Sequence, residues 1–91
     1  MVRVIRRDEV TGRLRSIFAT VLELPEASVG PELSPDNCEK WDSLHHIHIV
    51  SAIEETFGLS LGIEVQVEIL TFELGIIVVC EALKAEGRLA V

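Results

Sequence analysis

The segment from Asp42 to Gly58 constrains the fold more than any other part of the sequence, because its pattern predicts one amphipathic helix. Asp42 and Ser43 are residue types that begin helices, since their side-chain oxygens accept hydrogen bonds from unpaired backbone N–H groups. Gly58 stands where a left-handed residue commonly ends a helix. Between them, apolar residues recur at three- and four-residue steps, which predicts one apolar helix face. These residues are Leu44, Ile47, Val50, Ile53 and Phe57.

A second helix is predicted ahead of this one, over residues 8–24. Asp8 is expected to cap its N-terminus, Glu9 lies favourably in its first turn, and Pro25 marks its end. Its apolar stripe consists of Val10, Leu14, Ile17, Phe18, Val21 and Leu22.

A long loop is predicted for residues 26–41, which contain Gly30, two prolines and further turn-forming residues. Val29 and Leu33 are the apolar residues expected to anchor this loop on the helices. Trp41, at the end of the loop, is expected to shield the start of the following helix.

The segment after Gly58 gives an ambiguous pattern. Over residues 63–69 apolar and polar residues alternate, which by itself favours a strand, but a lone strand in a helical domain has no partner. Thr71 is expected to cap a last helix over residues 72–86, which Gly87 would stop. Gly75 costs this helix about 1 kcal/mol against alanine and is expected to permit close packing.

The chain of 91 residues is expected to form a single domain, residues 1–91, with residues 1–7 as a basic N-terminal tail. Hydrophobic residues make up 48% of the sequence, so disorder is not expected. Aromatic residues make up only 4%, which favours an aliphatic core of the kind found in helix bundles.

The net charge of −7 is unevenly distributed. Five of the eight basic residues lie in the first fifteen positions, whereas residues 16–83 contain one base, Lys40, and twelve acids. A body this acidic repels nucleic acid phosphates and attracts basic protein partners. The same charge also keeps an apolar chain dissolved.

The two cysteines give neither a disulfide framework nor a metal-binding spacing. Cys38 follows a turn proline and is expected to be exposed and reactive, whereas Cys80 lies in an apolar run and is expected in the core. The longest such run, residues 76–80, is too short to cross a bilayer, and no signal peptide is evident. A cytoplasmic location is expected.

Ser43 is displayed at the start of the predicted helix, where the helix dipole and free N–H groups favour an anion. The simplest role for such a serine is an N-cap, but Asp42 can supply that cap alone. No G-x-S-x-G elbow surrounds Ser43, and no histidine–acid pair with the arrangement of a catalytic triad is expected there. The residues therefore point to a modified or capping serine and not to a nucleophile.

The tripeptide Asp-Ser-Leu at residues 42–44 opens a helix that closes on Ile-Glu-Glu-x-Phe-Gly at residues 53–58. This combination, which runs without a gap over residues 42–59, resembles the acyl carrier protein family. In that family the motif serine is esterified by 4′-phosphopantetheine, and the thiol of this arm carries an acyl chain as a thioester. The resemblance implies an all-α fold: a small four-helix bundle with three longer helices, a short third helix, and a long loop between helices one and two.

The resemblance further implies a discrete acyl carrier protein that is not itself an enzyme. Ser43 would hold the arm, which comes from coenzyme A, and the protein would serve fatty-acid or polyketide-type biosynthesis. Its expected partners are a phosphopantetheinyl transferase and acyl-loading, ketosynthase or acyltransferase-type enzymes with basic docking surfaces, and the chain itself is expected to be a monomer. Asp42 would help to dock the transferase and Leu44 would contact partners, unless the two are merely a cap and a core residue. The residues expected to bind partners, or else to form a solvated face, are Leu44, His48, Ser51, Glu54, Glu55, Glu64 and Glu68.

A cavity for the acyl chain, if one is used, is expected among aliphatic side chains. Periodicity and resemblance together place it among Ile47, Ile49, Val50, Ile53, Ile63 and the last helix.

Three histidines, His45, His46 and His48, depart from the family pattern, in which this part of the helix is often acidic. His45 and His48 share a helix face, but two ligands without a third do not make a metal site, so no metal is expected. The histidines predict a docking face that is sensitive to pH between about 6 and 7.

Two alternatives stay open. A carrier of aminoacyl or peptidyl groups shares the expected fold and serine, although Asp42 in place of glycine favours the acyl type. The chain could also be a helical interaction domain that never receives the arm.

Overall fold

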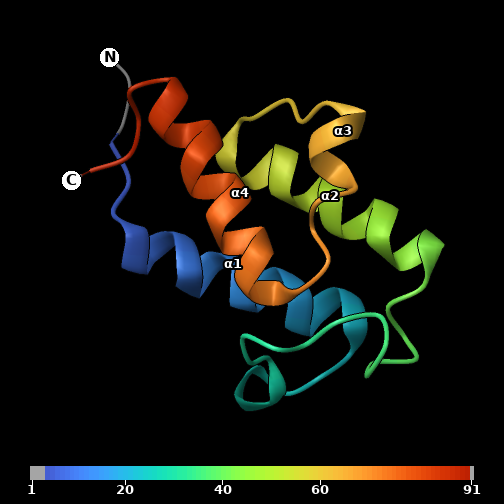
Figure 1. Cartoon of the computed structure of the whole chain (residues 1–91). Coiled ribbons are helices and arrows are strands. Elements are labelled where there is room, and N and C mark those ends of the chain that lie inside the picture. The colour runs from blue at the N-terminus through green and yellow to red at the C-terminus, as the bar shows by residue number, and fades with distance from the viewer. Residues whose placement is uncertain (1–3, 91) are drawn as a thin grey trace.

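The computed structural model describes residues 4–90, which form four α-helices, one short 3-10 helix and no β-strand. The helices are α1 (Arg7–Leu22), α2 (Ser43–Phe57), α3 (Ile63–Gln66) and α4 (Phe72–Ala85), with the 3-10 helix η1 (Glu26–Ser28) between α1 and α2 (Figure 1). The all-α prediction is thus confirmed for the described residues. None of these helices combines the length and the apolar character needed to cross a bilayer.

Helix α1 begins one residue before Asp8, so the predicted Asp8 cap is wrong. The N-cap position belongs to Arg6, whose side chain makes no capping hydrogen bond, and Asp8 lies inside the first turn. At the other end, Glu23 adopts a left-handed conformation (φ 56°) and its N–H group donates to the carbonyl oxygen of Ala19. The helix therefore ends two residues before the predicted Leu24.

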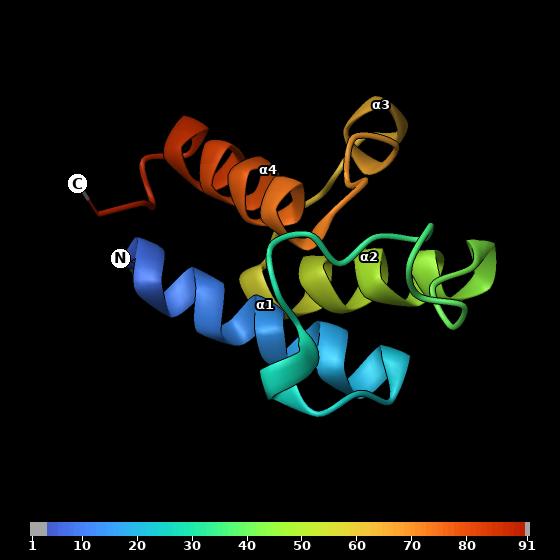
Figure 2. The same ribbon diagram turned by 60° about the horizontal axis from the view of Figure 1, so that its bottom comes forward.

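The core lies where α1 packs against both α2 and α4 (Figure 2). Phe18 of α1 is fully buried and makes edge-to-face contacts with Trp41 and Phe72, at ring-centroid distances of 5.2 and 5.1 Å. The few aromatic side chains thus gather inside an otherwise aliphatic core. The predicted stripe of α1 faces this core: Val10, Leu14, Phe18 and Leu22 are buried, and Ile17 and Val21 pack at its edge.

Helix α2 has the predicted bounds, but its buried face differs from the predicted one. Val50, Ile53 and Phe57 are buried as expected, together with Ile49. Leu44 and Ile47 are 58% and 59% exposed, so the predicted apolar face is not buried over the first turns of α2, and of the two alternatives for Leu44 the core residue is excluded. They belong to the first turns of α2, where the other helices do not cover the face on which they lie.

The loop between α1 and α2 is fastened to the start of α4. The N–H groups of Phe72 and Glu73 donate to the carbonyl oxygens of Leu33 and Pro31, at 2.9 and 3.2 Å. Val29 is buried and Leu33 is half-buried against the core, which confirms both predicted anchors. The loop thereby brings its last residues to the start of α2.

Residues 63–66 form one helical turn despite their strand-like alternation. The N–H groups of Val65 and Gln66 bond to the carbonyl oxygen of Gly62, so the turn satisfies its own backbone, as a strand without a partner could not. The turn stands at the edge of the bundle, on the side away from α1 (Figures 1 and 2). Ile63 is 70% exposed there, whereas Ile69, at the end of the segment, is fully buried.

Helix α4 begins as predicted, with the Thr71 hydroxyl accepting a hydrogen bond from the N–H group of Leu74 at 3.0 Å. It ends at Ala85, one residue before the predicted end, and Gly87 follows in a left-handed conformation (φ 69°). Gly75 is buried against α1, but the space beside it would admit a Cβ atom at ordinary contact distances, so the packing does not require a glycine there.

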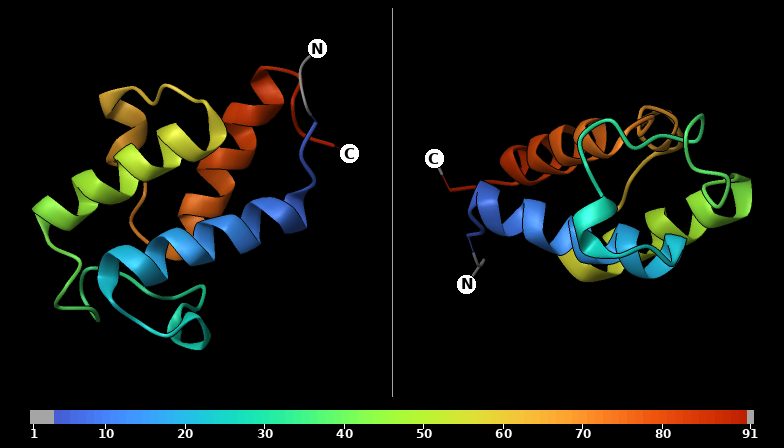
Figure 3. Two further views of the ribbon diagram at one scale, coloured as in Figure 1. Left: turned by 180° about the vertical axis from the view of Figure 1, so that it is seen from behind. Right: turned by 90° about the horizontal axis from the view of Figure 1, so that it is seen from below.

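The two ends of the described chain lie side by side (Figure 3). Ile5 is buried and forms a parallel bridge with Leu89, through hydrogen bonds of 2.8 Å to Arg88 and Ala90. Residues 4–7 are therefore part of the fold and not of the predicted basic tail, whose residues 1–3 lie outside the described residues.

Candidate functional site

Ser43 is the first residue of α2 and is exposed. The N-cap is Asp42, whose carboxylate oxygen Oδ1 accepts the N–H group of His45 at 2.9 Å. Within residues 4–90 no hydrogen bond is formed by the Ser43 hydroxyl or by the backbone N–H groups of Ser43 and Leu44. Asp42 thus takes the capping role, and the serine hydroxyl and two helix-end donors are left available.

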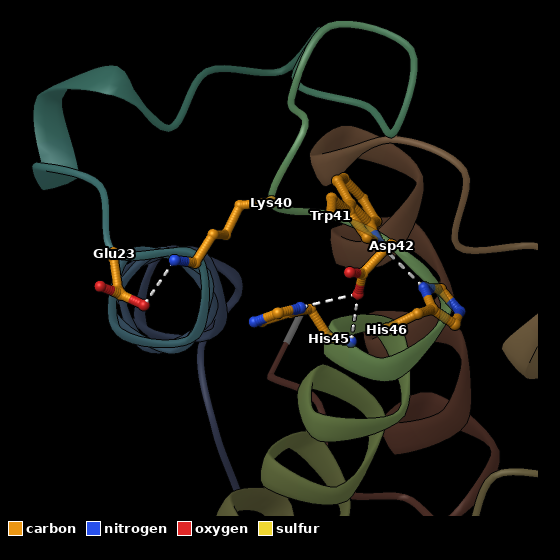
Figure 4. A network of polar contacts seen from close by, with 6 residues as sticks. All are labelled: Glu23, Lys40, Trp41, Asp42, His45 and His46. Atoms are coloured by element: carbon orange, nitrogen blue, oxygen red, sulfur yellow. Dashed lines mark hydrogen bonds and ion pairs between the residues drawn. The ribbon is translucent and has the colours of Figure 1, made fainter.

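The same Asp42 oxygen lies 2.7 Å from Nδ1 of His45 (Figure 4). The backbone N–H bond and then the side-chain bond from His45 lower the pKa of Asp42 below its ordinary value. The pair lies next to Ser43 but does not have the arrangement of a catalytic triad. The second ring nitrogen of His45 points to the side on which Lys40 and Glu23 lie, and it makes no hydrogen bond with Ser43 among the described contacts. The contacts between Asp42 and His45 therefore cap the start of α2.

Lys40 connects the segment before Ser43 to the end of α1. Its ammonium group lies 2.8 Å from a carboxylate oxygen of Glu23 (Figure 4), and this contact lowers the pKa of Glu23 and raises that of Lys40. Both side chains are well exposed, so the pair positions the segment more than it stabilises the fold.

On the other side of the site, the His46 ring connects Trp41 to Gln66. The indole Nε1–H of Trp41 donates to Nδ1 of His46 at 3.0 Å, and Nε2 of His46 lies 2.9 Å from the carbonyl oxygen of Gln66. An indole only donates and a carbonyl only accepts, so both bonds form together only when the ring is neutral and carries its proton on Nε2. The Trp41 side chain is buried and lies parallel to this ring, which confirms that it shields the helix start.

An apolar groove of about 620 Å³ opens beside Ser43. Its polar lining residues are Asp42, Ser43, His46 and Gln66. Its apolar lining residues are Pro35 and Trp41 from the loop, Ile47 from α2, and Ile63, Val67, Ile69 and Leu70 from α3 and the residues after it. Four of these apolar side chains, Ile47, Ile63, Val67 and Leu70, are 59–70% exposed, so the groove lies at the surface.

Of the residues predicted to line an acyl cavity, Ile47 and Ile63 line this groove. Ile49, Val50 and Ile53 are packed in the core, and α4 contributes no residue to the lining. The sequence did not indicate Pro35, Gln66 or Leu70, because their approach to Ser43 depends on how the loop and α3 fold back on α2.

The residues predicted to bind partners lie on α2 and the α3 segment, and most of them are exposed. These exposed residues are Leu44, His48, Ser51, Glu55, Glu64 and Glu68. Glu54 differs, because it is half-buried and its Oε2 accepts the N–H group of Leu61 at 2.8 Å. Glu54 therefore fastens the segment before α3, and its assignment to an acidic docking face stays a prediction.

The remaining reactive side chains form no further site among residues 4–90. The rings of His45 and His48 touch edge to face at 5.9 Å, but no three potential ligands gather around a metal position in this part of the chain. Cys38 is buried, so its predicted exposure is wrong. Cys80 is in the core as predicted, and burial raises the pKa of its thiol against the opposing charge of Arg7.

A comparison of the chain with models of known protein families finds no match.

Proposed function

We propose that the protein is an acyl carrier protein that receives 4′-phosphopantetheine on Ser43 and is not itself an enzyme. The observation that carries the proposal is the position of Ser43, which is exposed at the first residue of α2 and lies at the rim of an apolar groove. The local sequence over residues 42–59 resembles this family, and the helix lengths suit a bundle of the acyl carrier type.

The residues around Ser43 suit a phosphodiester. The free N–H groups of Ser43 and Leu44 and the positive end of the α2 dipole favour an anion attached at this point. Asp42 is already held by His45, so it keeps the helix start in place while a separate transferase modifies the neighbouring hydroxyl. The attached arm supplies the thiol that carries an acyl group as a thioester.

The lining of the groove indicates which chemical class of group the protein would carry. This lining is mostly aliphatic and aromatic, with Asp42, Ser43, His46 and Gln66 as its polar residues. An aliphatic acyl chain, as in fatty-acid or polyketide-type biosynthesis, fits such a lining better than a charged aminoacyl group does. In this proposal the groove shelters part of the arm or its acyl chain at the surface of α2 and α3.

The proposed partners are a phosphopantetheinyl transferase and acyl-handling enzymes with basic surfaces, in a cytoplasmic setting. Exposed Glu55, Glu64 and Glu68 give the α2–α3 side negative charge, and exposed Leu44 offers an apolar contact beside the serine. Charge of this kind speeds encounter with basic partners and makes the encounter dependent on salt.

Intact mass spectrometry tests the proposal. The chain is incubated with coenzyme A and a broad-specificity phosphopantetheinyl transferase, beside a Ser43→Ala variant. We expect a gain of one phosphopantetheine group in the wild type and none in the variant. No gain with several transferases would refute the proposal and favour a helical interaction domain in which Ser43 is only the first residue of a helix.

A further inference from the structure

Two side chains of α2 form hydrogen bonds with the segment that contains α3. Helix α3 is a single turn, none of its four residues is fully buried, and one isolated turn is not stable by itself in water. His46 bonds to the Gln66 carbonyl at its end, and Glu54 bonds to the N–H group of Leu61 before its start. The side chain of Gln66 also donates to the carbonyl of Leu61 at 2.9 Å, which links the two attachment points.

The His46 attachment requires one protonation state. Nδ1 must accept from Trp41, and Nε2 must donate to Gln66, so the ring cannot gain a proton at Nδ1 and keep both partners. A proton at Nδ1 would face the indole N–H directly. Because Trp41 is buried and packed on Phe18, its indole has little room to turn away, and the ring is the partner that must move.

We propose that His46 is a proton-operated latch, which in its neutral form closes Trp41 and α3 around the groove beside Ser43 and on protonation releases them. Movement of the ring draws it away from the Gln66 carbonyl, and Gln66 is a lining residue of the groove. Protonation therefore widens the groove beside Gln66. This regulation of access to Ser43 rests on the proposed function, but the latch itself does not.

The charged groups around the ring come from three segments. Asp42 and His45 lie at the start of α2, Lys40 precedes Trp41 in the loop, and Glu64 and Glu68 flank Gln66. Asp42 is engaged with His45 and Lys40 with Glu23, and within residues 4–90 the only hydrogen bonds of the His46 ring are those to Trp41 and Gln66. No carboxylate is therefore bonded to the ring to hold a proton on it in the closed form.

The direction of the pH effect follows from proton binding. The closed form has no place for a proton at Nδ1, because that nitrogen accepts from Trp41, whereas a released, solvated imidazole can take one up there. Acid therefore favours the open form, and the ratio of open to closed molecules rises by up to about tenfold for each unit by which the pH falls.

Nuclear magnetic resonance on the unmodified full-length chain tests the latch. The background is a His45→Gln/His48→Gln variant, in which His46 is the only histidine left, and the matched control also carries His46→Gln. The measurements are hydrogen exchange of the Trp41 indole and of the backbone amides of residues 66–69, between about pH 7.5 and 5.5. Rates are corrected for intrinsic pH dependence and compared with those of buried α1 amides.

We expect the protection of Trp41 and of residues 66–69 to fall together as His46 takes up its proton, and to stay constant in the control. Unchanged protection while the His46 ring titrates, or the same loss in the control, would overturn the latch. If the control does not fold, the background variant decides alone: protection that falls over the same pH range in which the His46 ring nitrogens take up a proton supports the latch, and protection that falls over a different range overturns it. Since no arm is attached, a failed latch leaves the proposal for Ser43 intact.

Discussion

Replacing Gly75 with alanine is expected to stabilise the fold, although Gly75 is buried between α4 and α1. A Cβ atom at this position would lie 3.4 Å from methyl carbons of Leu14 and Ile69 and 3.6 Å from the ring of Phe18. These are ordinary van der Waals separations, so one methyl group fits without moving its neighbours. Alanine improves helix propensity by about 1 kcal/mol, and burying a methyl group adds up to about 0.8 kcal/mol. The expected gain in the free energy of unfolding is about 1–2 kcal/mol.

Gly12 provides the matched control. It lies within α1, is exposed, and a Cβ atom built there meets nothing within 4 Å. Gly12→Ala should therefore give only the propensity gain of about 1 kcal/mol. Gly75→Leu adds three more carbons, for which the three neighbours leave no space, and should destabilise by about 1–3 kcal/mol.

Urea unfolding followed by far-ultraviolet circular dichroism measures all three variants, and thermal unfolding gives a second value at about 4–8 °C per kcal/mol. We expect Gly75→Ala to be at least as stable as Gly12→Ala, and Gly75→Leu to be less stable than the wild type. Loss of stability in Gly75→Ala beside a gain in Gly12→Ala would refute this expectation, because the contact of α4 with α1 would then be tighter than the structure shows.

Three further predictions concern the site. Asp42→Ala should lower the melting temperature and Ser43→Ala should leave it nearly unchanged, because Asp42 alone caps α2; equal losses in thermal unfolding would contradict this assignment. The pKa of Asp42 is lower in the folded protein than in the unfolded chain, so its carboxylate stabilises the fold at any pH above its pKa in the unfolded chain, which is about 4. This contribution is lost as the pH falls further, through the pKa of Asp42 in the folded protein. Asp42→Asn should therefore show a smaller fall in melting temperature on acidification, and an unchanged acid profile would argue against it. Ile63→Asp should leave stability within about 0.5 kcal/mol but weaken binding of a fluorescent fatty-acid probe, whereas Ile49→Asp should unfold the chain; unaltered probe binding in Ile63→Asp would exclude the groove as the site.

The helix ends that were predicted correctly depend on local contacts. Asp42 and Thr71 cap α2 and α4 through bonds to residues three positions on, and Gly58 and Gly87 adopt the left-handed conformation that ends a helix. Such features depend on neighbours in sequence, so residue type and spacing suffice to find them. The prediction for Asp8 was wrong although it also depended on residue type, because the N-cap position belongs to Arg6, whose side chain makes no capping hydrogen bond.

The parts that were predicted wrongly or missed depend on contacts between distant segments. Leu44 and Ile47 have the spacing of core residues, but whether a helix face is covered depends on which elements pack beside it. Cys38 is buried because its loop folds back on the helices. Likewise, the link from His46 to Gln66 spans twenty residues, and no local pattern indicates it.

The central claim about this protein is that Ser43 itself carries the arm. The most direct measurement is peptide fragmentation by mass spectrometry after modification with coenzyme A and a transferase, which locates the added group on one residue. We predict that all of the added mass lies on Ser43 and none on the other exposed serines, Ser16, Ser28, Ser51 and Ser60. Modification at any of those serines, or an unmodified Ser43 in a folded chain, would contradict the account.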